Sequence, residues 1–467
     1  MAQIPILQGI YATDSPDFQA AYPRNLLPVI TKQGISSGYL RPAPGLVSIG
    51  SGPGTPRGGI VWNGRIYRVM GTKLCEQSAS GAITVLGDVG AGGQCVMDYG
   101  YQFLAIASGG RLYYWDGGTL QQVTDGDLGE ALSVVWLAGY YITTDGTNIV
   151  TTDLTDPFSI NPLRYGASEF DPDPIMGVAT LRNDLYALNR YSVEAFQNVG
   201  GNGFPFARIE GSQTPRGSIG RTAFCKFLET IAFVGSGRNE APGVFLLGPG
   251  DTSRISTPTV EALLAEYTEE QLAGCVVEAR VERATSLLFI HLPDRTLCFD
   301  SAATKLSEEP VWFELTSSLV GLGQYKARDF LWTGTQWTCA DPTSNAIGRL
   351  SDDVSSHYGA VNGWQFETVA IFNEGRGAII HELELIALTG SVNLTARPVI
   401  WASYSDDGVK YSQERPTPAG VRGDRGKKIA WRSMGRMALW RTLRFRGTSD
   451  AHISMARLEG QLEALSV

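Results

Sequence analysis

One serine lies in a string that resembles a hydrolase nucleophile motif. Residues 34–38 read Gly-Ile-Ser-Ser-Gly and match Gly-x-Ser-x-Gly, with Ser36 at the nucleophile position. That motif needs a buried strand before the serine and a helix after it. The next residues, 39–45, read YLRPAPG, and two prolines in so short a stretch are incompatible with a helix. We therefore expect no catalytic role for Ser36.

Other residues that could perform chemistry are scattered or fit plainer explanations. No two of the four histidines have a metal-binding spacing. Residues 171–174 (DPDP) offer two carboxylates, but the alternating prolines favour a stiff connection over a cation site. Residues 235–243 lack the Lys-Ser/Thr ending of a phosphate loop and predict a long hairpin loop. Residues 405–408 (SDDG) resemble one imperfect Asp-box hairpin. We predict no enzyme, no cofactor and no metal. The histidines are His291, His357, His381 and His452.

The cysteines and the chain start give no sign of a disulfide framework or an export signal. Six cysteines are widely spaced, and no pair has the Cys-x-x-Cys spacing of a zinc or redox motif. We expect buried free thiols in a reducing compartment. The first residues, MAQIPILQ, lack the basic and apolar regions of a signal peptide. The sequence contains no uninterrupted run of 18 apolar residues, so we predict no transmembrane helix.

The middle of the chain repeats one short pattern of an apolar strand, a Gly/Asp turn and a second apolar strand. Clear copies are residues 60–69 (IVWNGRIYRV), 103–115 (FLAIASGGRLYYW) and 140–150 (YYITTDGTNIV). A unit of about 40–50 residues with four short strands is typical of a propeller blade. We predict an all-β fold with a β-propeller of six or seven blades over residues 58–358.

Two further regions flank the repeats. Residues 1–57 are rich in proline and glycine and predict an arm that joins the C-terminal domain. Residues 359–467 change to longer alternating strands and predict an antiparallel β-sandwich platform. One helical insert is expected at 258–273, with Thr257 as N-cap and a capping box beginning at Thr268.

Charge is distributed unevenly along the chain. Between Lys410 and Arg446 there are eleven basic and two acidic residues, a local net charge of +9. The remainder carries about −18, since the total is −9. Such asymmetry indicates an assembly surface or a nucleic-acid face, and a solvated sandwich edge is the plainer alternative.

Several segments, in the same order along nearly the whole chain, resemble the tail-hub proteins of short-tailed phages. These proteins are also called tail nozzle or packaged-DNA stabilisation proteins. The similar segments are residues 17–28 (DFQAAYPRNLLP), 36–45 (SSGYLRPAPG), 267–270 (YTEE), 287–293 (LLFIHLP), 405–411 (SDDGVKY), 431–436 (WRSMGR) and 443–446 (LRFR). The blade interiors between them match poorly, so the distal face of the propeller could serve different contacts here.

The resemblance implies a structural virion protein of the tail, made in the host cytoplasm. It implies a ring, usually of six subunits, below the portal and its adaptor ring. That ring would extend the channel for double-stranded DNA without sequence-specific binding, retain the packaged genome until ejection, and carry a needle, plug or fibres. The host envelope is an expected contact at the distal end. The alternatives are a non-catalytic receptor- or glycan-binding propeller of a tail fibre, and a propeller that hydrolyses or lyses glycans.

The basic C-terminal segment supplies most of the candidate assembly residues. Alternation over residues 440–446 puts Arg441 on one face with Leu443, and Arg444 and Arg446 on the other. A charge removed from water needs a partner. We therefore expect carboxylates from a neighbouring subunit or the adaptor ring, in preference to DNA. The candidate assembly residues are Arg432, Arg436, Arg441, Arg444, Arg446, Tyr39 and Arg41.

Overall fold

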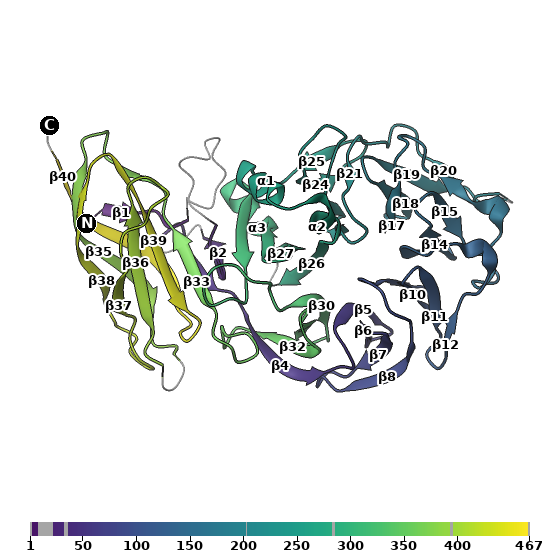
Figure 1. Ribbon diagram of the computed structural model, residues 1–467, viewed down its shortest axis with the longest axis horizontal. Coiled ribbons are helices and arrows are strands. Elements are labelled where there is room, and N and C mark those ends of the chain that lie inside the picture. Colours follow the sequence, from purple (N-terminus) through teal and green to yellow (C-terminus); the bar gives the residue numbers. More distant parts are fainter. Residues whose placement is uncertain are drawn as a thin grey trace.

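Two β-rich bodies lie side by side along the long axis of the molecule (Figure 1). The computed structural model describes residues 2–7, 22–31, 36–201, 203–282, 285–392 and 396–465. A propeller forms the larger body and a sandwich of two sheets the smaller one. No helix among the described residues is both long enough and apolar enough to cross a membrane.

The propeller has seven blades within the described residues, and each blade is an antiparallel sheet. Blade 1 consists of β5 (Pro56–Trp62), β6 (Arg65–Met70), β7 (Lys73–Gln77) and β8 (Ile83–Asp88). Blade 2 consists of β9 (Val96–Tyr99), β10 (Leu104–Ser108), β11 (Arg111–Trp115) and β12 (Leu120–Gln122). Blade 3 consists of β13 (Val134–Leu137), β14 (Tyr140–Thr144), β15 (Asn148–Thr151) and β16 (Gly166–Ala167). Blade 4 consists of β17 (Ile175–Leu181), β18 (Asp184–Asn189), β19 (Val193–Asn198) and β20 (Phe206–Arg208).

The remaining blades lie nearer to the sandwich (Figure 1). Blade 5 consists of β21 (Gly217–Ser218), β22 (Phe224–Phe227), β23 (Thr230–Ser236), β24 (Gly243–Leu247) and β25 (Thr252–Arg254). Blade 6 consists of β26 (Val276–Glu282), β27 (Thr285–His291), β28 (Thr296–Asp300) and β29 (Val311–Leu315). Blade 7 consists of β30 (Arg328–Trp332), β31 (Trp337–Ala340), β32 (Ala346–Ser351) and β4 (Gly45–Ser51).

Strand β4 closes the ring of blades and corrects the expected domain boundary. It comes from the N-terminal arm and pairs with β32, from Ala346↔Ser51 to Ser351↔Gly45. Residues 1–57 were predicted to form an arm that joins the sandwich, whereas residues 45–51 belong to a sheet of the propeller. Pairing a strand from one end of the repeats with three strands from the other end buries the exposed edges of both.

Neighbouring blades are joined by contacts between their innermost strands and by carboxylates that accept backbone hydrogen bonds from the next blade. The first strands of blades 1, 2 and 3 contact one another in turn, and β30 of blade 7 returns to β5 of blade 1. The Glu278 carboxylate of blade 6 accepts hydrogen bonds from the backbone N–H groups of Asp329 (3.1 Å) and Phe330 (3.0 Å) in blade 7. Asp98 of blade 2 accepts one from the N–H of Trp136 in blade 3 (2.8 Å). Such bonds satisfy buried backbone groups at the blade boundaries.

The sandwich has two antiparallel sheets that share an apolar core. The first sheet has the order β2 (Leu26–Ile30), β3 (Gly38–Pro42), β40 (Ser454–Ala464), β35 (Ala378–Leu388) and β38 (Ile429–Met437), with β1 (Ala2–Ile4) paired to β40. The second has the order β33 (Gly363–Glu367), β39 (Trp440–Thr448), β36 (Val399–Ser405) and β37 (Arg415–Pro418), with β34 (Ile371–Phe372) paired to β39. Between the sheets, Phe445 packs on Phe366 and Trp431 with ring centroids 5.0 and 5.2 Å apart. Three strands of the arm thus extend the first sheet.

Among the described residues, three α-helices lie at blades 5 and 6. Helices α1 (Pro258–Ala265) and α2 (Glu269–Ala273) form the expected insert. The Thr257 side chain caps α1 and Thr268 forms the predicted capping box with Gln271. The structure adds α3 (Ser301–Ser307), which begins where the Asp300 carboxylate accepts a hydrogen bond from the N–H of Ala303. At seven residues α3 is too short for a periodic signal, and its position depends on contacts with β2 and β27.

Asn25 holds the arm between the two bodies. Its backbone N–H donates to the Glu314 carbonyl of blade 6 (2.8 Å), and its side-chain amide donates to the Gly363 carbonyl of the sandwich (2.7 Å). Its side-chain oxygen accepts from the N–H of Thr316 (2.9 Å). Strand β2 contacts both β29 and β33 and lies between the propeller and the sandwich (Figure 1). The arm therefore contacts both domains and connects them.

Candidate functional site

The structure divides the candidate assembly arginines into exposed and internally paired residues. Arg432 and Arg436 are exposed on β38. Arg441, Arg444 and Arg446 on β39 pair with carboxylates of the same chain. Carboxylates were expected from a neighbouring subunit or the adaptor ring, whereas these three residues have partners on nearby loops and strands of the same sandwich.

Arg441 lies inside the sandwich. Its side chain is 1% exposed and forms a two-pronged ion pair with Asp406, at 2.7 and 3.1 Å. It also donates to the backbone carbonyls of Met434 and Arg436 in β38, both at 2.7 Å. The guanidinium carbon lies 3.8 Å from the centre of the Tyr404 ring. Arg441 therefore ties β38 of one sheet to β36 and β39 of the other.

Arg444 and Arg446 form a charged row on the outer face of the second sheet. Arg444 pairs with the buried Glu367 carboxylate (2.6 Å) and stacks over Tyr411 (3.3 Å). Arg446 pairs with Glu414 and stacks over Trp401 (4.7 Å). Because both guanidinium groups already have a carboxylate and an aromatic ring, they stabilise the sheet and offer little free charge to a partner.

Strand β38 forms one edge of the first sheet, and arginine and threonine side chains cover several of its carbonyls. Arg415 donates to the carbonyls of Arg432 (3.1 Å) and Ser433 (2.6 Å), and Thr417 donates to that of Ala430 (3.2 Å). Together with the bonds from Arg441, these contacts block pairing with a further strand at this edge. The exposed side chains of the edge are then its basic ones, chiefly Arg432 (80% exposed) and Arg436.

Tyr39 and Arg41 lie on β3, and Arg41 contacts the propeller. The Arg41 guanidinium is 3.4 Å from the carboxylate of Asp352, which follows β32 of blade 7. It is 3.8 Å from the carboxylate of Glu282, the last residue of β26 in blade 6. Tyr39 is half-buried and lines a cavity of about 240 Å³ between the arm and α3. Arg41 thus links the two domains within one chain.

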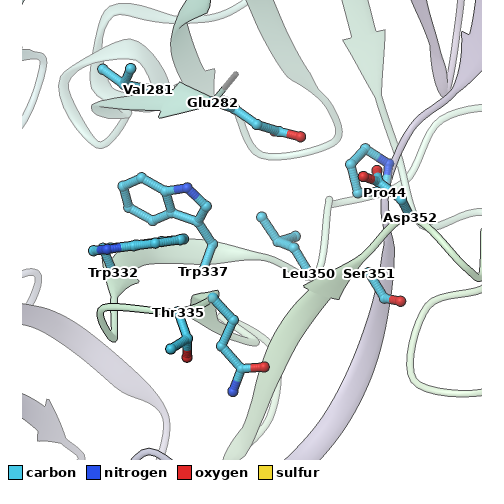
Figure 2. A pocket seen from close by; sticks show the side chains of 10 residues that line it. Pro44, Val281, Glu282, Trp332, Thr335, Trp337, Leu350, Ser351 and Asp352 are labelled. Carbon is cyan, nitrogen blue, oxygen red and sulfur yellow. The ribbon is translucent and has the colours of Figure 1, made fainter. Parts of the chain in front are cut away.

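A larger pocket opens between blades 6 and 7 (Figure 2). It has a volume of about 580 Å³. Trp332 and Trp337 form one wall, with ring centroids 5.4 Å apart and an angle of 56° between the rings. Val281 and Glu282 lie across the pocket from them (Figure 2). Pro44, Leu350, Ser351 and Asp352 close one side, and Thr335 and Gln336 complete the lining. Trp332 is 45% exposed and Val281 is 60% exposed.

Opposite charges lie at opposite ends of the molecule. Residues 98–184, in blades 2–4, contain twelve acidic and three basic residues. Figure 1 places these blades at the end farthest from the sandwich, whose segment 410–446 carries the basic excess. The propeller end therefore has a large acidic excess, and the basic excess lies in one segment of the sandwich.

The residues first considered for chemistry have structural positions. Ser36 precedes strand β3 and not a helix, and its hydroxyl donates to the Gly38 carbonyl; Gly34 and Ile35 lie outside the described residues, as do residues 17–21. Asp171 pairs with Arg238, and Asp173 accepts a hydrogen bond from the N–H of Tyr191. The described residues contain no group of three or more His, Cys, Asp or Glu side chains placed to hold a metal.

Each histidine has a hydrogen-bond partner, and the six cysteines are free thiols. His291 contacts Glu278 (2.7 Å), His357 contacts Ser317 (2.7 Å), His381 contacts Glu463 (2.7 Å) and His452 contacts Ser355 (2.9 Å). Burial lowers the pKa of His357 to about 3. Five of the six cysteines are buried, and burial raises the pKa of Cys75 to about 11. These thiols are therefore protonated and unreactive at neutral pH.

Sequence reasoning missed the pocket and the partners of the arginines. Trp332 and Trp337 are separated by a four-residue turn, a spacing that predicts a cross-strand pair on a hairpin. That signal was present in the sequence. Asp406, Glu367 and Glu414 carried no such signal, because their pairing depends on which strands meet in the sandwich.

Comparisons with known proteins cover nearly the whole chain. The family model described as "Bacteriophage P22 Gp10, beta-propeller" matches residues 2–355, and "Bacteriophage P22 Gp10, beta-sandwich" matches residues 363–463. The tail hub protein gp10 of Salmonella phage P22 is 28% identical over 485 residues, which cover 99% of each chain.

Two solved structures resemble part of the chain at low identity. The Pan2 WD40 domain of Neurospora crassa is 9% identical, with a TM-score of 0.43, covering 66% of this chain and 96% of that domain. PorZ, a surface component of the type-IX secretion system of Porphyromonas gingivalis, is 12% identical, with a TM-score of 0.40, covering 66% of this chain and 38% of that protein.

Proposed function

Because the chain belongs to the bacteriophage P22 Gp10 family and is a structural tail hub protein of the virion, we propose that it works as a ring of identical subunits. Six subunits would extend the DNA channel below the portal and its adaptor, retain the packaged genome and open the way for ejection. The full-length match and the two matched domains carry this proposal. A closed homo-oligomer is also the usual way in which one chain lines a channel.

The exposed basic edge of the sandwich is the proposed docking surface. Arg432 and Arg436 project from β38, whose position is fixed from inside by Arg441. Both side chains are exposed, and the Arg432 guanidinium lies 4.0 Å from the Glu382 carboxylate of the same chain. Carboxylates of a neighbouring subunit or of the adaptor would supply the counter-charge, and electrostatic complementarity of this kind sets the register and rate of assembly.

The acidic propeller end suits a channel protein that must release DNA. Phosphates bind through Lys and Arg side chains, and the region 98–184 has a large excess of carboxylates. Double-stranded DNA would therefore pass the ring without tight or sequence-specific binding. A needle, plug or fibre, and the host envelope, remain proposed partners at the distal end. We propose no catalytic role, since Ser36 lacks the strand–turn–helix setting of a nucleophile.

Charge reversal of the exposed edge tests the docking surface. The double variant Arg432→Glu/Arg436→Glu should stay folded by circular dichroism but fail to form rings in electron micrographs or to join the portal complex. The matched control is Arg65→Glu/Arg182→Glu, which makes the same charge change at exposed propeller arginines (63% and 69% exposed).

Each result of this experiment has a defined meaning. Normal tails from the Arg432/Arg436 variant would refute the docking surface. Intact rings that lose packaged DNA would instead assign this edge to the channel. Equal loss of rings in the control would mean that total charge, and not the β38 edge, controls assembly.

A further inference from the structure

We propose that the pocket between blades 6 and 7 binds a neutral saccharide. This inference goes beyond the structural role in the tail, because it assigns the propeller a ligand site of its own. The pocket volume of about 580 Å³ falls within the range of small-molecule sites, roughly 300–1,000 Å³. Its walls combine two indole rings, tilted by 56° to each other, with a rim of hydrogen-bonding groups.

The aromatic wall is held in place by its hairpin. Trp332 and Trp337 are directly opposite each other in the β30–β31 pair, at the strand ends that flank the turn. The turn is closed by a bond from the N–H of Thr333 to the Gln336 carbonyl (3.0 Å) and by one from the N–H of Gln336 to the Thr333 hydroxyl (3.2 Å). A ligand would therefore meet indole rings that are already ordered, which lowers the entropic cost of binding.

An indole face prefers a flat ligand surface with slightly positive hydrogens. The π-system carries negative charge on its face, and C–H groups make weak favourable contacts with such faces. A pyranose ring offers such a surface, with its C–H groups on one face and its hydroxyls around the edge. Trp332 remains 45% exposed, so part of its face is open to solvent and available for stacking.

The charges around the pocket favour a ligand without net charge. Glu282 and Asp352 provide two carboxylates, and Arg41 lies 3.8 and 3.4 Å from them. Arg280 binds Glu282 from the buried side (2.9 Å). Each of the two carboxylates therefore lies within ion-pair distance of a guanidinium group of the same chain. A cationic ligand would compete with the arginines, and an anionic one would meet the carboxylates.

The polar rim matches the needs of hydroxyl groups. Carboxylates accept hydrogen bonds, whereas Gln336, Ser351 and Thr335 both donate and accept. A sugar hydroxyl also donates and accepts, so it can satisfy partners of both kinds. The pocket should bind sugar analogues that lack one of these hydroxyls more weakly, because a buried polar group of the protein would then have no hydrogen-bond partner. A peptide segment would use the apolar wall but fewer rim groups.

Saturation-transfer NMR on the purified full-length chain tests this site. The probes are D-glucose, D-galactose, D-mannose, L-rhamnose and N-acetyl-D-glucosamine, each at tens of millimolar. At least one should receive saturation on its ring protons. Trp332→Ala should weaken that binding about tenfold, the loss expected for one aromatic stacking contact. Asp352→Asn, which keeps the side-chain shape, should weaken binding with the fold unchanged.

The matched control is Tyr101→Ala. Tyr101 is also exposed (90%), in the turn between the first two strands of blade 2, and it is not among the residues that line the pocket between blades 6 and 7. Binding should be unchanged in this variant. The proposal is overturned if no sugar of the panel receives saturation, or if Trp332→Ala binds as well as the native chain. Binding is measured on isolated subunits, so it does not depend on the ring.

Discussion

Replacing Arg441 by methionine removes the charged tie between the two sheets of the sandwich while keeping a side chain of similar length. Four hydrogen bonds are lost: two to the Asp406 carboxylate and two to the carbonyls of Met434 and Arg436. Breaking a buried ion pair by removing one partner costs about 3–5 kcal/mol. Asp406 is 47% exposed and is rehydrated in the variant, so we expect the lower end, about 3 kcal/mol.

Hydrogen–deuterium exchange measures this loss locally, which matters in a chain of two domains that need not unfold together. A loss of about 3 kcal/mol corresponds to a drop in protection of roughly 10²-fold. The drop should be confined to amides of β38, β39 and the 405–408 turn, with the propeller blades unaffected. The control Arg446→Met removes an ion pair whose two partners are both partly exposed (35% and 36%) and should lower protection about tenfold or less.

One result would refute the internal role of Arg441. If Arg441→Met keeps native protection in β38 and β39 but no longer forms rings, the residue acts at a subunit interface and not as an internal tie. A loss of both protection and rings is expected, because Arg436 lies on the strand that Arg441 positions.

Two further predictions concern the closure of the propeller and the domain junction. Arg68 is fully buried and donates to the Asp329 carbonyl (2.9 Å) and to the side chains of Gln77 and Thr338. Arg68→Met leaves these buried acceptors without that donor, so it should cost about 1–3 kcal/mol and expose amides of blades 1 and 7, unlike the exposed control Arg65→Met. Protection unchanged in those blades would contradict this. Burial holds the pKa of His357 at about 3, below its usual 6.5, so the neutral form is the one that the fold favours. Its stabilisation is complete above pH 6.5 and declines as the pH falls, by about 2 kcal/mol at pH 5. Exchange corrected for intrinsic rates should show this pH dependence at residues 357–360, and His357→Gln should lose it; an equal decline in both proteins would rule it out.

Local chemistry along the chain was enough to predict the architecture. Alternating apolar strands joined by Gly and Asp turns are short-range patterns, so the repeats indicated a propeller and its blade number within one. The helix caps at Thr257 and Thr268 were equally local and form as predicted. The absence of a helix after Ser36 followed from its neighbouring prolines. Alternation also placed Arg441 on the inner face of β39.

Tertiary structure alone decided which distant segments meet. Strand β4 closes blade 7 across about 300 residues, and the arm strands β1–β3 join a sheet with β40 from the opposite end of the chain. Strand pairing between remote segments carries no local signal, because any alternating strand fits many edges. The carboxylates that pair with Arg441, Arg444 and Arg446 could not be predicted from the sequence for the same reason. Composition thus determined that the C-terminal segment is basic, and folding determined that Arg441, Arg444 and Arg446 pair within the chain while Arg432 and Arg436 are exposed on β38.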